Sequence, residues 1–187
     1  MQDSRDRLLV PLRAVSLLLT PLGEGHRAAL RTACAADPAI WPLYATSFAP
    51  AQFDTSFDAL RANPGRLAFA VIHDDALVGM TAYLRLDPAA QTLEIGNSYL
   101  APAARGTGLN MAMKRLMIEH AFACGFRRIE LRIDTRNARS MAAARKLGAV
   151  QEGILRAERI IWTGHVRDSA LFALLREDWQ RAQTRLP

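Results

Sequence analysis

Apolar runs separated by turn-forming residues divide the first third of the chain into one strand and two helices. The apolar stretch Ala14–Leu22 predicts a strand, and the alanine-rich stretch Gly23–Asp37 predicts a helix. A loop is expected over Pro38–Pro50, and a short helix over Thr55–Ala62. The chain therefore opens with β, α and α segments.

The centre of the chain predicts an antiparallel meander. Two apolar runs, Leu67–His73 and Ala76–Leu86, flank the dipeptide Asp74-Asp75, which is typical of a hairpin turn. A third apolar run, Gln91–Leu100, extends the meander. Three sequential antiparallel strands are expected here.

The second half adds a parallel crossover and a closing pair of strands. A helix that begins after Gly108 separates the meander from Phe126–Asp134, a segment whose apolar and charged residues alternate cleanly. Because a helix joins them, we expect these two strands to be parallel. Asn137 and Gly148 delimit another helix, and the strands Ala149–Ile161 and Arg167–Leu175 follow.

The predicted fold is a mixed α/β (α+β) arrangement. It has a central, twisted, mostly antiparallel sheet of about seven strands with helices on both faces. We expect one domain over residues 1–187, of which about 1–12 form a loose N-terminal extension.

The net charge of the chain indicates which class of binding partner is favoured. The formal net charge is +6, which favours anionic partners such as phosphates, but no run of five basic residues occurs. Direct binding to nucleic acid is therefore not expected.

Cysteine, histidine and the first residues argue for a cytoplasmic protein without a metal. The two cysteines and four histidines are scattered without ligand spacing. Pro11, Arg13 and Pro21 interrupt the first apolar run, so neither a membrane span nor a signal peptide is predicted.

The segment Ser98–Leu116 contains the clearest chemical signal. Gly106 and Gly108 stand where a helix begins, and the amides of a first helical turn have no intrahelical partner. Gly106–Asn110 is thus a plausible phosphate cradle with Arg105 as an adjacent cation, although a plain helix start is the alternative. A P-loop is excluded because no Gly-Lys-Ser/Thr occurs, and a dinucleotide motif fails at Met111.

Two motifs carry a resemblance to a known family. The loop "RGTGLN" resembles the acyl-CoA loop of the GNAT acetyltransferases, Gln/Arg-x-x-Gly-x-Gly/Ala, although Asn110 departs from its sixth position. The runs "EIGNSYLAPAARGTGLNMAMKRLMIEHAF" and "DTRNARSMAAARKLGAVQEGILR" resemble the branch that contains the RimJ and RimL ribosomal-protein N-terminal acetyltransferases. The likeness extends from about Leu93 to Trp179.

The resemblance implies the GNAT acyl-CoA N-acyltransferase fold, in which two parallel strands splay apart and acyl-CoA lies in the gap. It implies that acetyl-CoA is the co-substrate; homodimers are common in this branch, although the sequence does not give the oligomeric state. The residues it implies for coenzyme A are Asn97, Ser98, Tyr99 and Leu100 beside the pantetheine arm, Arg105, Gly106, Thr107, Gly108, Leu109 and Asn110 at the pyrophosphate, and Asn137 and Lys146 nearby.

The resemblance also implies direct attack of an amine on the thioester. Many GNAT enzymes protonate the leaving thiolate with a tyrosine, where this chain has Ala144; we expect Ser140 in that role, or else simply as an early helix residue. Glu94 is the candidate base, unless it is an ordinary paired carboxylate or ordered water serves instead. Trp41 and Tyr83 are candidate acceptor contacts, each with a place in the core as the alternative.

The function expected from these residues is acetyl transfer from acetyl-CoA to a primary amine, either a protein N-terminus or a small molecule. The competing hypothesis is an acyl-CoA-binding module or sensor without turnover, which the missing tyrosine favours. RNA binding through the basic surface is a third hypothesis, and it predicts salt-dependent affinity.

Overall fold

The computed structural model of the chain describes residues 4–184. Its helices and strands are α1 (Ser4–Leu8), β1 (Leu12–Ala14), β2 (Leu17–Pro21), η1 (Glu24–His26), α2 (Arg27–Ala35), η2 (Pro38–Leu43), α3 (Phe53–Ala62), β3 (Arg66–His73), β4 (Ala76–Asp87), β5 (Thr92–Leu100), η3 (Pro102–Ala104), α4 (Leu109–Ala123), β6 (Arg128–Asp134), α5 (Ala138–Lys146), β7 (Val150–Ile160), β8 (Val166–Leu175) and α6 (Arg176–Gln183).

All the strands join one sheet in the order β1-β2-β3-β4-β5-β6-β8-β7. Only the β5–β6 pairing is parallel, as the crossover through α4 predicts; the other pairings are antiparallel. The mixed fold is confirmed, but the count of about seven strands is corrected to eight. The predicted strand Ala14–Leu22 corresponds to β2, and the additional strand is β1, which pairs with β2 after a turn at the fully exposed Val15.

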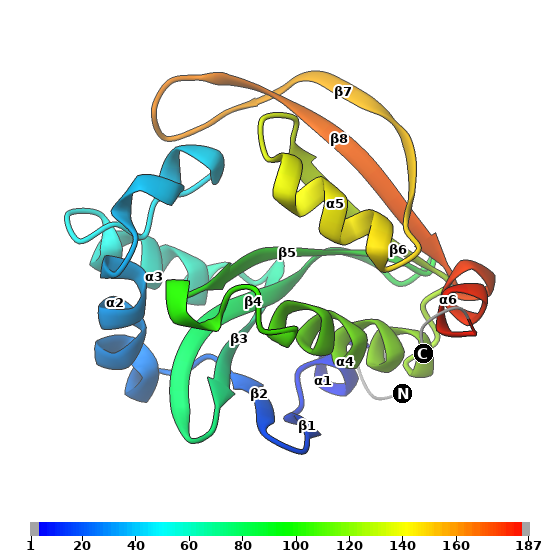
Figure 1. The fold of residues 1–187 in the computed structure, drawn as a ribbon, viewed down its shortest axis with the longest axis horizontal. Helices are drawn as coiled ribbons and strands as arrows, with labels where there is room; N and C mark the ends of the chain where they lie inside the picture. Colours follow the sequence, from blue (N-terminus) through cyan, green and yellow to red (C-terminus); the bar gives the residue numbers. More distant parts are fainter. Residues whose placement is uncertain (1–3, 185–187) are drawn as a thin grey trace.

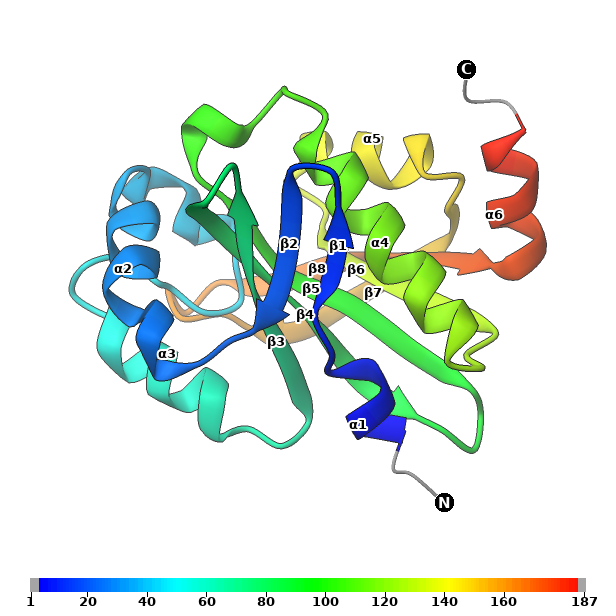
Figure 2. The same cartoon turned by 90° about the horizontal axis from the view of Figure 1, so that it is seen from below.

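Helices cover both faces of the sheet, and each face has its own core (Figures 1 and 2). On one face the buried side chains of α4, α5 and α6 pack with Leu67, Tyr83 and Ile95 of the sheet. On the other face α2, α3 and the η2 segment pack around Tyr99. The long hairpin of β7 and β8 curves along one edge of the sheet (Figure 1).

The first described residues are part of this packing. We expected a loose extension over about 1–12; in the structure residues 4–14 form α1 and β1, and Leu8 has no exposed surface in the α4-side core. The end of the chain adds α6, which sequence patterning did not predict, and Trp179 buries it against the same core.

The parallel strands β5 and β6 separate soon after they begin to pair. Their register covers only Thr92–Glu94 of β5 and Arg128–Glu130 of β6. Both strands continue beyond these residues, to Leu100 and Asp134, without pairing to each other. A gap between two strands is thus built into the middle of the sheet.

Candidate active site

A β-bulge at Asn97 redirects the side chains of β5 toward this gap. The register with β4 shifts between Met80 and Ala82, and Asn97 has a positive φ of 49°, which is uncommon outside glycine. Because one extra residue is inserted, Ser98 faces α4, where it contacts Thr81 and Lys114. The bulge therefore places Ser98, and not Asn97, on the face of β5 that packs against α4.

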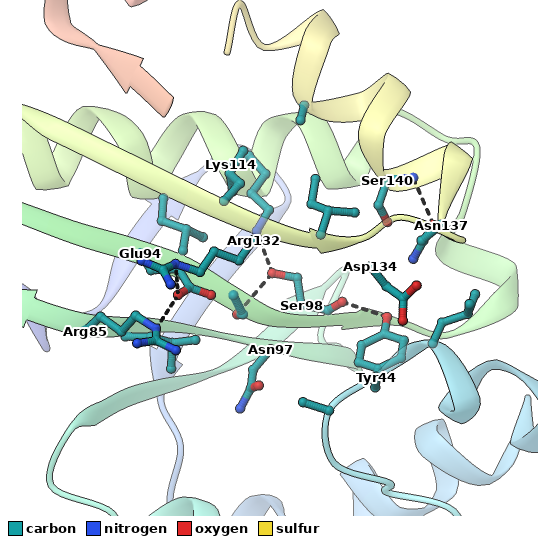
Figure 3. Close-up of a pocket in the computed structure, with 18 of the residues that line it drawn as sticks. Tyr44, Arg85, Glu94, Asn97, Ser98, Lys114, Arg132, Asp134, Asn137 and Ser140 are labelled. Carbon is teal, nitrogen blue, oxygen red and sulfur yellow. Dashed lines mark hydrogen bonds and ion pairs between the residues drawn. The ribbon is translucent and has the colours of Figure 1, made fainter. Parts of the chain in front are cut away.

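The gap opens into a cavity of about 450 Å³ (Figure 3). Its wall brings together six residues that the sequence predicted for the site: Glu94, Asn97, Ser98, Asn110, Asn137 and Ser140. They come from β5, α4 and α5 and from the turn before α5. In Figure 3 Glu94 lies toward one end, and Asn137 and Ser140 toward the other.

The turn before α4 leaves room for a ligand. Gly106 and Gly108 have φ values of 79° and 87°, which glycine adopts without strain, and a Cβ at either position would point into open space. Gly108 is the N-cap of α4 and supplies no side-chain hydrogen bond to the helix start. The Leu109 amide donates to Thr107 Oγ1 over 3.4 Å, and the next amides of the first turn, at the positive end of the helix dipole, remain available for an anion.

Arg105 is held in the loop by groups of the chain itself. Its Nε donates to the Leu100 carbonyl over 2.7 Å, and Nη1 donates to Asp37 over 2.5 Å. The guanidinium also lies over the Tyr99 ring, 5.4 Å from its centroid. Because Asp37 neutralises this charge, the anion-binding capacity of the turn rests chiefly on its backbone amides.

Glu94 lies in the cavity wall with only 5% of its surface exposed. Burial raises the pKa of its carboxyl, while Arg85 and Arg132 oppose the shift. Its Oε2 is 3.0 Å from Arg85 Nε and 3.6 Å from Arg132 Nε, yet it accepts no hydrogen bond from the described residues. A carboxylate with a free lone pair and a raised pKa is suited to accept a proton.

Lys114 of α4 is a cavity residue that sequence reasoning missed. It is 7% exposed, its Nζ donates to Ser98 Oγ over 2.5 Å, and it forms no ion pair within residues 4–184. Burial lowers the pKa of its ammonium to about 7. A signal was present in the sequence: one of only two lysines stands on the helix stripe with Met117 and Ile118.

The start of α5 supplies the other end of the cavity. The Asn137 side chain accepts from the Ser140 amide over 3.0 Å and so caps the helix, as predicted. Asp134, just before it, accepts from the backbone and guanidinium of Arg136, and these hydrogen bonds outweigh burial and keep the pKa of Asp134 low. The cap fixes the helix start, so the Ser140 side chain stands in the cavity wall.

The remaining predicted residues lie away from the cavity. Trp41 is fully buried and stacks on Tyr99 with ring centroids 4.8 Å apart. Tyr83 is fully buried under α4 and donates to the Met117 carbonyl over 2.7 Å. Both side chains are thus placed in the core, the alternative given for each. Lys146 is exposed at the last turn of α5, about 12 Å along the helix axis from its start.

Tyr44 fills the place that Trp41 was expected to take. It lies in the same irregular segment, lines the cavity, and donates from its hydroxyl to the Ser98 carbonyl over 2.8 Å. Nothing in the local pattern of "AIWPLY" distinguishes these two aromatic residues, because their burial depends on strands distant in sequence. The side chains of Tyr99 and Leu100 are likewise buried, which leaves their backbone as the part that could face a ligand.

Comparison with known proteins agrees with this geometry. Residues 16–150 of the chain match the family of acetyltransferase (GNAT) domains. The chain belongs to the GNAT acetyltransferase family. The predicted family is therefore confirmed, and this family uses acetyl-CoA.

Individual relatives support the same assignment. An uncharacterized N-acetyltransferase of Mycobacterium tuberculosis is 28% identical over 115 residues, which is 61% of this chain and 72% of the relative. The crystal structure of a probable GNAT acetyltransferase from Chromobacterium violaceum is 31% identical, with a TM-score of 0.84, covering 92% of this chain and 89% of the other.

The fold is also similar to that of Mycobacterium smegmatis RimJ in complex with CoA disulfide. The TM-score is 0.77 over 94% of this chain and 93% of RimJ, at 23% identity. This likeness in fold is consistent with the RimJ/RimL-like branch of the GNAT family that the motifs indicated.

Two further properties bear on the site. No group of three or more histidine, cysteine, aspartate or glutamate side chains within residues 4–184 is arranged to hold a metal ion. None of the helices in this part of the chain is long and apolar enough to cross a membrane.

Proposed function

We propose that this GNAT protein transfers the acetyl group of acetyl-CoA to a primary amine. The observation that carries the proposal is the parting of β5 and β6, which opens a cavity lined by both strands. An anion-binding helix start adjoins Asn110 on this wall, and a buried carboxylate, Glu94, lies toward the opposite end. A two-substrate transfer needs a donor site and a proton acceptor in one continuous space.

The residues present fit coenzyme A. The open space above Gly106 and Gly108 and the amides at the start of α4 suit a pyrophosphate. The buried Asn97 Nδ2 has no hydrogen-bond partner among the described residues, so a carbonyl group of the pantetheine arm would satisfy it. When bound, acetyl-CoA supplies an acetyl group already activated as a thioester.

We assign Glu94 the role of general base for the acceptor amine. Its free Oε2 accepts a proton from the incoming ammonium, directly or through water, so that the neutral amine can attack. The nitrogen then forms a bond to the acetyl carbon as the carbon–sulfur bond breaks. The pKa raised by burial makes Glu94 a stronger base than an exposed glutamate.

Ser140 is the group we assign to the leaving sulfur. Its hydroxyl donates a proton or a hydrogen bond to the thiolate, the role that the tyrosine absent at Ala144 has in many relatives. Both residues line the cavity, and the Asn137 cap holds the backbone of Ser140 in place.

The test is release of free thiol from acetyl-CoA in the presence of peptides and small amines. The proposal expects release with at least one acceptor class, and slower release for Ser140→Ala and Glu94→Gln with unchanged acetyl-CoA affinity by calorimetry. Tight binding of acetyl-CoA without release from any acceptor would refute transfer and support a binding module instead.

A further inference from the structure

The end of the cavity around Glu94 is lined by arginines from four strands. Arg66 begins β3, Arg85 lies at a register shift near the end of β4, and Arg132 and Arg159 belong to β6 and β7. Arg66 is paired in register with Leu84, the neighbour of Arg85, and it interacts electrostatically with Arg159 and Glu94. These side chains form one cluster.

Ion pairs with glutamates neutralise the positive charge of most of these arginines. Glu94 forms ion pairs with Arg85 and Arg132. Glu158 forms ion pairs with Arg85, Arg132 and Arg159. Glu158 also accepts from Ser169, and these partners outweigh burial and hold its pKa at about 2. Arg132 also pairs with Glu130, and Arg167, a further arginine of the cavity wall, lies 3.9 Å from Asp134.

Arg66 is the arginine left over. Its side chain forms no ion pair or hydrogen bond within residues 4–184, although it lines the cavity and is only partly exposed. Burial and the nearby charge of Arg159 lower the pKa of its guanidinium. Partial burial of an unpaired cation is unfavourable, and an anion in the cavity would relieve it.

The backbone around Arg66 is fixed by the turn that joins α3 to β3. The Arg66 amide donates to the Asn63 carbonyl over 3.1 Å, and the Asn63 side chain accepts from the Gly65 amide over 2.8 Å. Asn63 and Gly65 also line the cavity. The guanidinium is therefore presented from a constrained segment, which lowers the entropic cost of binding an anion.

We propose that the acceptor is an amine that also carries a carboxylate, which Arg66 binds while Glu94 receives the amino group. This inference rests on the proposed acetyl transfer and adds the substrate class. A guanidinium pairs with a carboxylate through two parallel hydrogen bonds, and a lysine in its place would not. The opposite charges of Arg66 and Glu94 match a zwitterionic group, such as a free amino acid or the N-terminus of an acidic peptide.

The donor is not the anion that Arg66 binds. The first turn of α4 provides for the pyrophosphate, and it adjoins Asn110, whereas Arg66 belongs to the cluster around Glu94. Removing the Arg66 charge should therefore leave the affinity for acetyl-CoA unchanged.

The test compares acceptors that differ only in a carboxylate. One arm uses alanine and alaninamide; the second uses two short amidated peptides that begin with aspartate or asparagine. We expect the wild-type kcat/KM for thiol release to be about 10- to 100-fold higher for the carboxylate in at least one arm. The arm that discriminates tells whether the source is a free amino acid or a peptide.

Variants test whether Arg66 is the residue responsible for the preference for a carboxylate. Arg66→Gln should raise KM for the carboxylate acceptor, leave its neutral counterpart unchanged, and leave acetyl-CoA binding by calorimetry intact. Arg66→Lys should restore only part of the preference. The control is Arg61→Gln, because Arg61 is an exposed arginine of α3 that pairs with Glu24 and does not line the cavity.

Two results would overturn the inference: equal wild-type kcat/KM for charged and neutral acceptors in both arms, or an Arg66→Gln variant that weakens both acceptors equally. Absence of thiol release from every acceptor, with acetyl-CoA binding intact, would instead refute the proposed transfer, and the inference would fall with it.

Discussion

Replacing Lys114 with methionine should stabilise the protein, most of all at low pH. The ammonium is buried, its only hydrogen bond goes to Ser98, and no carboxylate pairs with it within residues 4–184. Methionine is similar in length and has no charge to desolvate. Ser98 would keep its contact with Thr81 at 2.8 Å, so the substitution leaves no buried hydroxyl without a partner.

The size of the effect follows from the pKa of Lys114, about 7 in the folded chain against 10.5 ordinarily. A lowered pKa in the folded state means that the unfolded chain binds the proton more tightly, so the penalty is fully present below pH 7 and disappears above pH 10.5. Each unit corresponds to about 1.4 kcal/mol, so the penalty is about 5 kcal/mol at pH 6 and about 1.4 kcal/mol at pH 9.5.

The measurement is urea unfolding of the wild type and Lys114→Met at pH 6, 8 and 9.5. The advantage of the variant should shrink by about 3 kcal/mol between the extremes, whatever pH-independent packing change accompanies the substitution. The control is Lys146→Met, which removes the other lysine from an exposed position on α5. An advantage that stays constant with pH would show that Lys114 is not desolvated in the folded chain.

Four further outcomes are expected. Gly108→Glu should abolish acetyl-CoA binding by calorimetry, whereas Gly164→Glu, also at positive φ and facing open space but in the β7–β8 turn, should not. Ser140→Ala should slow thiol release by about 100-fold or more at unchanged acetyl-CoA affinity; unaltered turnover would remove Ser140 from the mechanism. Because Glu94 must be ionised to act as a base, kcat/KM should rise with pH through its raised pKa, and Glu94→Gln should lack that limb. Asn137→Ala should cost about 1 kcal/mol in urea unfolding through loss of the α5 cap, and no loss would contradict the capping hydrogen bond.

Features set by neighbours in sequence could be predicted. The hairpin at Asp74-Asp75, both of which have positive φ, depends on a two-residue turn, and the α5 cap depends on residues three apart. The glycine turn before α4 is equally local, because the conformational freedom of Gly106 and Gly108 does not depend on the rest of the fold. These local rules were enough to indicate the order of the main strands and helices from β2 to β8 and the glycine turn before α4.

Residues whose role depends on distant partners were assigned less well. Trp41 and Tyr83 are aromatic residues near the site in sequence, but packing against opposite faces of the sheet buries them in the core. The strand β1 was likewise missed, because its three residues show no apolar pattern of their own and only pairing with β2 makes them a strand.

The bulge at Asn97 is the clearest example of a feature that the tertiary structure decides and the sequence pattern does not. Simple alternation places Ser98 and Leu100 on the same face as Glu94, but the inserted residue turns both toward α4. The sequence alone determined the order of the main elements from β2 to β8, the glycine turn and the family motifs, all of which rest on short-range constraints. Only the folded chain could set Lys114 beside Ser98 and leave Arg66 unpaired near Glu94, since burial and charge balance depend on strands far apart in the chain.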